Sequence, residues 1–382
     1  MPARRKTAAR RLSLYRSFGE TARRGSGEAP ARGADRVPEA GVVTVRALVI
    51  DDSPTMRGIV AALLRRDPEV EVVGTAATPA AARSMIRELD PDVITLDLEM
   101  PGMDGLAFLE KIMRLRPTPV VMVSAHTTRG AEATVRALEL GAIDCYAKPA
   151  GGLGALRDLD DGGLAAMVKL AAGCRDRLQQ PRRAARFAER FRWNGRIAAI
   201  AASTGGVEAL GALLAGYPDN GPPTIVVQHM PAGFTRMFAA RLDARVAPRV
   251  VEAEDGMPVE QGHVYIAPGG TRHLTVSGRK QLVCRLNEGA PVSGHRPSAD
   301  ATFHSLARHP AERIVGAILT GMGEDGADGL AALRKLGMPT IGQDEASALI
   351  YGMPRAAAER GALAEILPVD RIAARIMELC RC

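Results

Sequence analysis

Three polar residues in the second half of the chain, Ser203, His229 and Asp325, have the types that nucleophilic catalysis requires. Each comes shortly after an apolar run, and Ser203 is followed by Thr204 and two glycines. A serine can attack a carbonyl carbon when a neutral histidine accepts its proton and a buried carboxylate orients that histidine. A glycine-rich turn after a strand lifts such a serine out of the sheet. These residues therefore predict hydrolytic acyl chemistry if the fold brings them together.

Neighbouring residues could fill the same roles, and the sequence alone leaves them open. His295 and His304 are alternative bases, and Glu324 and Asp328 are alternative carboxylates. The small-residue turn at Ser203 could instead bind a phosphate or pack a helix tightly on a strand. It lacks the G-x-G-x-x-G spacing, which argues against a dinucleotide site.

A second group of polar residues, in the first half of the chain, predicts a site for a cation and a phosphoryl group. Asp51 and Asp52 follow one apolar run, Asp97 follows another, and Ser124 and Lys148 end two more. Three carboxylates at one edge of a sheet stay ionised together only beside a cation, and hard oxygen ligands suit Mg²⁺. The lysine and the hydroxyl would receive phosphate oxygens. Helix caps and a surface charge are the alternative, but the full set at strand ends argues against it.

The elements that position these residues alternate strand and helix. In residues 45–178 we expect strands over Val45–Ile50, Val70–Thr75, Val93–Leu96, Val120–Val123 and Asp144–Ala147. The helices expected between and after them cover Thr55–Arg66, Ala80–Leu89, Leu106–Arg116, Ala131–Leu140 and Leu164–Leu178. Regular alternation predicts a parallel sheet with helices on both faces, and such sheets bind ligands beyond the carboxyl ends of their strands.

Residues 195–382 predict a second α/β domain with a doubly wound, mostly parallel sheet. Its expected strands are Ile197–Ala201, Thr224–Gln228, His263–Ala267, Ile314–Leu319 and Pro339–Ile341. An antiparallel hairpin is expected from His273–Val276 and Leu282–Arg285, joined through Gly278. Helices are expected over Val207–Leu214 and Gly326–Leu336. Ser203, His229 and Asp325 then all lie at carboxyl ends of strands, where open α/β sheets place their sites.

The positive charge of the chain is concentrated at its N-terminus. Residues 1–44 hold ten basic and four acidic side chains, so they carry +6 of the formal net charge of +7. We expect this stretch to be a disordered basic tail and the arginine-rich stretch 179–194 to be a linker. The nearly neutral remainder and the 3% of aromatic residues argue against nucleic-acid binding.

Membrane insertion and disulfide formation are not expected either. No apolar run approaches the ~18 residues of a membrane span. The five cysteines are scattered and form no C-x-x-C pair, which indicates free thiols. We therefore expect a cytoplasmic protein.

The segment 45–178 resembles the response-regulator receiver domain, which has a flavodoxin-like (βα)5 fold. The motifs that carry the resemblance are VIDDSPTMR, ITLDLEMPGMDG, VVMVSAHT and CYAKP. The resemblance implies phosphorylation at Asp97, Mg²⁺ binding by Asp51, Asp52, Asp97 and the backbone carbonyl of Glu99, phosphoryl contacts from Ser124 and Lys148, and a switching aromatic at Tyr146. It also implies a histidine kinase as the phosphodonor.

The segment 195–382 resembles the catalytic domain of chemotaxis protein-glutamate methylesterases. The motifs include IAASTGGVEAL, VVQHMPAGFT, SGHRPSADATF and ILTGMGEDGADGL. The resemblance implies Ser203 as nucleophile, His229 as base, Asp325 as orienting residue and a backbone amide near Met322 in the oxyanion hole. It gives no role for the motif His295–Asp300. The family usually has glycine where this chain has Ala201.

Together the resemblances imply phosphorylation-activated hydrolysis of glutamate γ-methyl esters, and deamidation of glutamines, on the cytoplasmic helices of chemoreceptors. The esterase reaction itself is expected to need no cofactor. The alternative is a catalytically idle adaptor with a phosphorylatable receiver domain. A transcription factor is disfavoured, because no helix-turn-helix pattern follows the linker.

Overall fold

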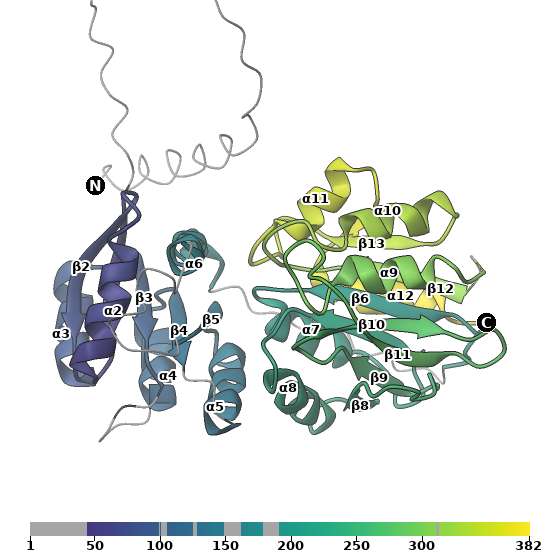
Figure 1. Ribbon diagram of the computed structural model, residues 1–382, viewed down its shortest axis with the longest axis horizontal. Coiled ribbons are helices and arrows are strands. Elements are labelled where there is room, and N and C mark those ends of the chain that lie inside the picture. Colours follow the sequence, from purple (N-terminus) through teal and green to yellow (C-terminus); the bar gives the residue numbers. More distant parts are fainter. Residues whose placement is uncertain are drawn as a thin grey trace, which may run out of the picture. The chain divides into compact units, whose positions relative to one another are not determined.

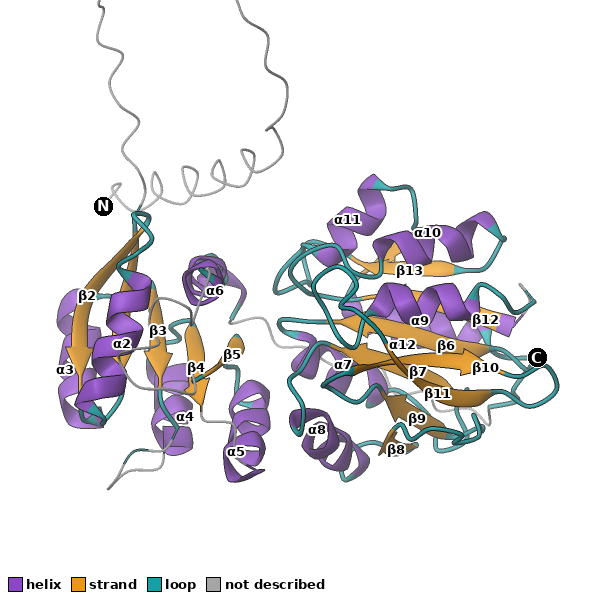
Figure 2. Ribbon diagram, viewed as in Figure 1, coloured by secondary structure: helices purple, strands orange, loops and turns teal. Residues whose placement is uncertain are grey.

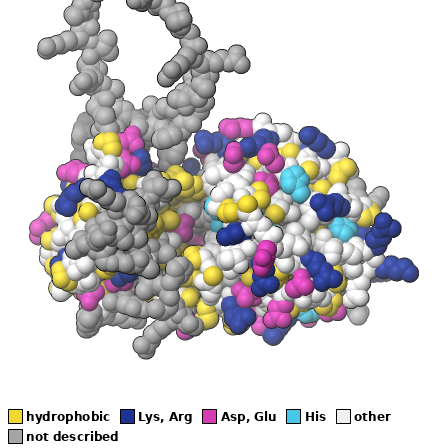
Figure 3. Space-filling model, viewed as in Figure 1, with side chains coloured by type: hydrophobic (Ala, Val, Ile, Leu, Met, Phe, Trp, Pro, Cys, Tyr) yellow, Lys and Arg dark blue, Asp and Glu magenta, His cyan; other side chains and the backbone are white. Residues whose placement is uncertain are grey.

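The computed structural model describes residues 44–98, 100, 105–124, 128–148, 162–178, 191–310 and 313–382. The expected basic tail, apart from Thr44, and residues 179–190 of the expected linker lie outside the described residues. Among the helices that are described, none is long and apolar enough to cross a membrane. On the face seen in Figure 3, acidic and basic side chains are interspersed over the described surface.

The first domain contains a five-stranded parallel sheet with the order β2-β1-β3-β4-β5 (Figure 1). Its strands are β1 (Val45–Ile50), β2 (Val70–Ala76), β3 (Val93–Leu96), β4 (Val120–Ser124) and β5 (Asp144–Ala147). Its helices are α2 (Pro54–Leu64), α3 (Pro79–Leu89), α4 (Gly105–Leu115), α5 (Thr128–Glu139) and α6 (Gly163–Ala172), and a 3₁₀ turn, η3, follows at Arg175–Arg177. The strand order reverses between β1 and β3, so the carboxyl ends of these two strands flank the crevice where such sheets bind ligands.

The second domain contains a seven-stranded parallel sheet with the order β14-β13-β12-β6-β7-β9-β8 (Figure 2). Its strands are β6 (Ile197–Ala202), β7 (Thr224–Gln228), β8 (Arg249–Glu252), β9 (His263–Ile266), β12 (Ile314–Ile318), β13 (Thr340–Gln343) and β14 (Glu365–Leu367). The antiparallel hairpin pairs β10 (Arg272–Ser277) with β11 (Val283–Glu288). The helices are α7 (Gly206–Leu214), α8 (Phe234–Asp243), α9 (Ala299–Leu306), α10 (Ala327–Lys335), α11 (Met353–Glu359) and α12 (Val369–Leu379). Here the strand order reverses between β6 and β12.

The predicted fold class is confirmed for both domains, and the sequence reading missed two strands of the second sheet. These are β8 and β14, which form its two edges. Each has three or four residues, a charged residue at an end and partly exposed side chains. Short, charged edge strands lack the buried apolar run that identifies a central strand.

The central strand β6 separates two layers of core. Ala198, Ile200 and Ala202 pack with residues of α7, α8 and α12 on one face. Ile197, Ala199 and Ala201 pack on the other face, against residues of α9, α10, α11 and the hairpin. This alternation follows from the two-residue period of side chains along a strand. Both layers therefore fix the position of the residue that follows β6.

Residues 191–194, expected to belong to the linker, pack on the second domain. Phe191 is buried in the core layer that contains α12. The indole nitrogen of Trp193 donates to the carbonyl of Arg196, and the side-chain amide of Asn194 donates to the carbonyl of Leu379. The second folded unit therefore includes these residues.

Candidate active site and phosphoacceptor site

Ser203 lies in a sharp turn between β6 and α7 that requires glycine at two positions. Gly205 has φ +77°, and a Cβ at Gly206 would come within 2.0 Å of the Gln228 side-chain oxygen. The backbone of Ser203 is held on both sides: its N–H donates to Thr320 (3.0 Å), and its carbonyl accepts from the side-chain amide of Gln228 (2.9 Å). The turn therefore presents the serine at the carboxyl edge of the sheet.

His229 and Asp325 form a hydrogen-bonded pair at the same edge. Nε2 of His229 lies 2.8 Å from Oδ2 of Asp325, whose side chain is fully buried. The carboxylate also accepts from the Ser298 hydroxyl and the Ala299 N–H, both at 2.7 Å, and from the Asp300 N–H at 3.1 Å. Burial alone would raise the pKa of Asp325, but the bonds from His229, Ser298 and Ala299 outweigh it and hold the pKa below its ordinary value.

The other ring nitrogen of His229 is available to accept a proton. Nδ1 is buried and has no hydrogen-bond partner among the described residues. Because a carboxylate only accepts, Nε2 carries the hydrogen and Nδ1 carries the lone pair. The His229 N–H donates to the Ala202 carbonyl (3.1 Å), which places it beside the strand end that bears Ser203. Ser203 and His229 line one cavity of about 240 Å³.

The alternative residues that the sequence left open take other positions. Glu324 and Asp328 are more than half exposed, and both bind Arg360. His304 is exposed on α9. His295 stacks on the ring of His229, with centroids 3.8 Å apart and planes 6° from parallel. Of these four residues, only His295 reaches the pair that His229 forms with Asp325.

The loop after β12 lies directly against Ser203. A Cβ at Gly321 would approach the Ser203 Cβ to 2.8 Å, so only glycine permits this contact. Met322 is the next residue along the loop, and its side chain is 44% exposed. Its backbone therefore lies beside the serine, in the region where an oxyanion donor is expected.

The acidic residues of the first domain also meet at one edge. One carboxylate oxygen from each of Asp51, Asp52 and Asp97 lies within 4.8 Å of the others. Nζ of Lys148 is 2.6 Å from Oδ2 of Asp97 and 3.1 Å from Oδ2 of Asp51. Burial would lower the pKa of Lys148, but its hydrogen bond to Asp97 outweighs this and raises it. The lysine stays charged and balances one of three carboxylates, which leaves a site whose donors and net charge fit a divalent cation.

Helix α2, which follows Asp51 and Asp52, is capped by a serine hydroxyl and not by one of these carboxylates. The Ser53 hydroxyl caps α2 by accepting from the Met56 N–H at 3.3 Å. Burial raises the pKa of Asp51 and outweighs the nearby charge of Lys148, which lowers it. Ser124 is buried at the end of β4, and Tyr146 lies on β5 against the core of this domain. Glu99 lies outside the described residues.

Comparison with known proteins agrees with the resemblance that the sequence shows for each domain. Residues 198–376 match the family model described as CheB methylesterase, and residues 47–157 match that of the response regulator receiver domain. The chain is 52% identical over 338 residues to protein-glutamate methylesterase/protein-glutamine glutaminase 1 of Caulobacter vibrioides, covering 88% of this chain and 98% of that protein. The chain belongs to the protein-glutamate methylesterase/protein-glutamine glutaminase family.

Other members and a solved structure extend the comparison. The protein-glutamate methylesterase/protein-glutamine glutaminase of Bordetella parapertussis is 47% identical and covers 87% of this chain and 96% of its own length. The crystal structure of the Thermotoga maritima CheB methylesterase catalytic domain is 36% identical, covers 49% of this chain and 99% of that one, and gives a TM-score of 0.47.

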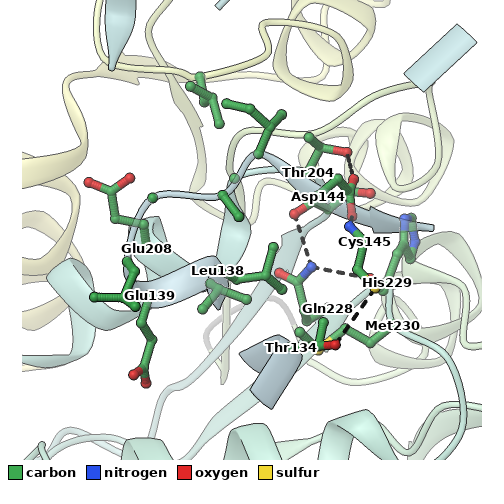
Figure 4. A pocket seen from close by; sticks show the side chains of 18 of the residues that line it. Thr134, Leu138, Glu139, Asp144, Cys145, Thr204, Glu208, Gln228, His229 and Met230 are labelled. Atoms are coloured by element: carbon green, nitrogen blue, oxygen red, sulfur yellow. Dashed lines mark hydrogen bonds between the residues drawn. The ribbon is translucent and has the colours of Figure 1, made fainter. Parts of the chain in front are cut away.

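The receiver domain contributes side chains to the cavity that contains Ser203. Leu138, Asp144 and Cys145 of the receiver domain line it together with His229 of the methylesterase domain (Figure 4). Ser203 belongs to the same lining. This edge of the methylesterase sheet is therefore covered by the receiver domain in the structure.

Polar bonds join the two domains around this cavity. The Thr204 hydroxyl donates to Oδ2 of Asp144 (Figure 4), and burial raises the pKa of that carboxyl. Glu139 of α5 accepts from Arg241 and also pairs with Arg245 at 3.0 Å. The bond between Thr204 and Asp144 ties the receiver domain to the residue next to Ser203.

The sequence reading missed several residues that contact this site. Ser298 could have been suspected, because a serine before a helical stretch is a common N-cap and its motif had no assigned role. It caps α9, accepting from the Ala301 N–H at 3.3 Å, and it also donates to Asp325. Asp144 carried no signal, because nothing in a strand pattern reports a contact with another domain.

Proposed function

We propose that this chain hydrolyses glutamate γ-methyl esters and deamidates glutamines on the cytoplasmic helices of chemoreceptors, under the control of phosphorylation at Asp97. The observation that carries the proposal is the buried Asp325–His229 pair in a chain of this family, with Ser203 lining the same cavity as His229 and Nδ1 of His229 without a partner among the described residues. An idle adaptor would have no use for an orienting carboxylate held by three further donors.

The geometry supports a two-step acyl transfer. Nδ1 of His229 takes the proton of Ser203 as the Oγ attacks the γ-carbonyl carbon, and Asp325 stabilises the imidazolium. The oxyanion binds backbone N–H groups, among them that of Met322, and such donors are commonly the largest single contribution to the rate. His229 then gives the proton to the methoxy oxygen of the ester, or to the amide nitrogen of a glutamine, and the C–O or C–N bond breaks to release methanol or ammonia. Water then attacks the acyl-serine by the reverse sequence and releases glutamate.

The acidic site of the receiver domain supports phosphoryl transfer to Asp97. Asp51, Asp52, Asp97 and the Glu99 carbonyl would hold Mg²⁺, which neutralises the charge on the transferring phosphoryl oxygens when bound. Lys148 already contacts Asp97 and is placed to pair with a phosphoryl oxygen on it. Ser124, at the end of the adjacent strand β4, would donate to another oxygen. A chemotaxis histidine kinase is the proposed donor.

The lining of the cavity supports regulation by covering the nucleophile. Leu138, Asp144 and Cys145 of the receiver domain line it together with Ser203 and His229. A receptor helix is about 10 Å across with its side chains, so it needs the space that the receiver domain occupies. Access of a receptor to Ser203 therefore requires the receiver domain to move away.

We expect a phosphodonor with Mg²⁺ to raise the rate of methanol release from methylated receptor membranes at least about tenfold, a coupling of ~1.4 kcal/mol. The added charge at Asp97 would shift an equilibrium between covered and open enzyme toward the open form. Asp97→Asn should abolish the rise and keep the basal rate. A fragment that begins at Phe191 should be active without phosphodonor. A fragment no faster than the unphosphorylated chain would contradict this form of regulation.

We expect Asp144→Ala to raise the basal rate about three- to tenfold, because it removes the bond to Thr204, and a typical hydrogen bond contributes about 0.5–1.5 kcal/mol net. The further increase caused by the phosphodonor should become smaller in proportion, since the substitution has already shifted the equilibrium toward the open enzyme. Methanol release with and without phosphodonor measures both. Asp67→Ala is the matched control, because Asp67 pairs with Lys169 within the receiver domain. An unchanged basal rate would show that this bond does not hold the domains together.

A further inference from the structure

The motif His295–Asp300 contacts both partners of the catalytic pair. Its second half holds Asp325 through Ser298, Ala299 and Asp300. Its first residue, His295, stacks on His229 with nearly parallel rings whose centroids are 3.8 Å apart. The two halves of the motif thus flank the two ends of one hydrogen bond.

His295 is held in place by the backbone on both sides of it. Its N–H donates to the Val292 carbonyl at 2.9 Å, and its carbonyl accepts from the Val292 N–H at 3.1 Å. The following Arg296 donates through its guanidinium to the carbonyls of Gly289 (2.7 Å) and Gly270 (3.3 Å). A ring mounted on so constrained a backbone forms a fixed surface against which another ring can be positioned.

The stack on His295 restricts the orientation of the His229 ring plane, which the bond to Asp325 alone does not determine. One hydrogen bond at Nε2 fixes a point on the His229 ring but permits the ring plane to tilt about that point. A parallel ring at van der Waals distance fixes the plane, and with it the direction of Nδ1. Small misplacements of a reacting group lower a rate strongly, because proton transfer depends on alignment.

The charges around His229 are compatible with this role. The titratable groups that face it are Asp325 from the loop after β12, Asp144 from β5 and His295 from the loop before α9. Burial, together with the nearby His229, lowers the pKa of His295 to about 4. His295 is therefore neutral at neutral pH and does not repel the imidazolium that forms on His229 during the reaction.

We propose that His295 is a positioning residue for the serine chemistry: its ring stacks on His229 and directs Nδ1 toward Ser203. This rests on the proposed hydrolytic function but concerns the reactivity of Ser203 itself. It can therefore be tested with a reagent that modifies activated serines, whatever the natural substrate is.

The test measures the rate at which a fluorophosphonate labels Ser203 in the full-length protein carrying Asp97→Asn in every sample, with Ser203→Ala as the blank. We expect His295→Ala and His295→Leu to slow labelling about tenfold and His295→Phe to retain at least about half of the rate. His304→Ala, a histidine exposed on α9, is the matched control and should label normally. A purely space-filling role would make the leucine variant as good as the phenylalanine variant, which would overturn the proposal.

The pH dependence of labelling separates positioning from base chemistry. His295→Phe carries no titratable group at this position, so the midpoint of its pH–rate profile for labelling should match that of the unsubstituted protein. A shift of more than about one pH unit would identify His295 as the base and overturn the proposal. If His295→Ala lowers the melting temperature, the labelling rates of His295→Phe and His295→Leu still test the proposal. If the unsubstituted protein is labelled at Ser203 but releases no methanol, the proposed function is contradicted. The labelling rates of the His295 variants would still test the positioning role.

Discussion

Ser203→Ala is expected to slow methanol release from methylated receptor membranes by about four to six orders of magnitude, because the members of a catalytic triad act as a unit. The substitution removes the oxygen that forms the acyl intermediate and leaves His229 and Asp325 without a group to activate. The backbone bonds that hold the turn, to Thr320 and from Gln228, do not involve the side chain that is lost. The melting temperature should therefore stay close to that of the unsubstituted protein.

A second serine provides the control for this substitution. Ser277 lies at the end of β10, in the hairpin, and Ser277→Ala should leave methanol release unchanged. Retention of more than a tenth of the rate in Ser203→Ala would mean that Ser203 is not the nucleophile. The fluorophosphonate should then label another residue, which peptide mass spectrometry would locate.

Asp325→Asn is expected to lower the rate by about two to four orders of magnitude. The carboxylate accepts four hydrogen bonds through two oxygens, whereas an amide can accept through one oxygen and must donate through its nitrogen. Either orientation of the amide opposes some of the donors from His229, Ser298, Ala299 and Asp300. Where the amide nitrogen faces His229, it forces the hydrogen of the imidazole onto Nδ1 and removes the base. The turnover number in the phosphorylated enzyme measures the loss.

The same substitution should alter the dependence of stability on pH. The pKa of Asp325 is held below its ordinary value, so the stabilisation it contributes is complete above about pH 3.8 and is lost as the pH falls through the lower, native pKa. The asparagine variant lacks this contribution, and its melting temperature should approach that of the unsubstituted protein only in that acid range. Asp328→Asn is the control, since Asp328 is exposed beside Arg360. Equal losses in both variants would contradict the special role of Asp325.

The sequence predicted the central elements well because buried strands leave a clear mark. The limits of β1, β3 and β7 match the apolar runs, and the limits of β6 differ by one residue. The candidate residues at strand ends followed from the same pattern, because a parallel sheet collects the carboxyl ends of its strands at one edge. The edge strands β8 and β14 were missed, since what makes a strand suitable for an edge also removes its apolar signature.

The choice among candidate residues depended on contacts that a linear pattern does not contain. Glu324 and Asp325 are adjacent, yet one binds Arg360 at the surface and the other is buried against His229. The stack of His295 on His229 joins residues more than sixty positions apart, and Thr204 meets Asp144 across two domains. Periodicity reports which face a residue occupies in its own element, and it carries no information on which distant element covers that face.

The composition of β6 makes this strand tolerant of smaller side chains and intolerant of larger ones. Four of its six residues are alanine, and all six are buried between two layers of helices. Truncation can remove little volume from such a strand, whereas each added methylene must displace a helix or the hairpin, at a cost of typically about 1–3 kcal/mol. Variation that persists at these positions should therefore exchange small residues for one another. The strand that leads to Ser203 has mostly small side chains, and these small side chains allow the elements on its two faces to pack close to it.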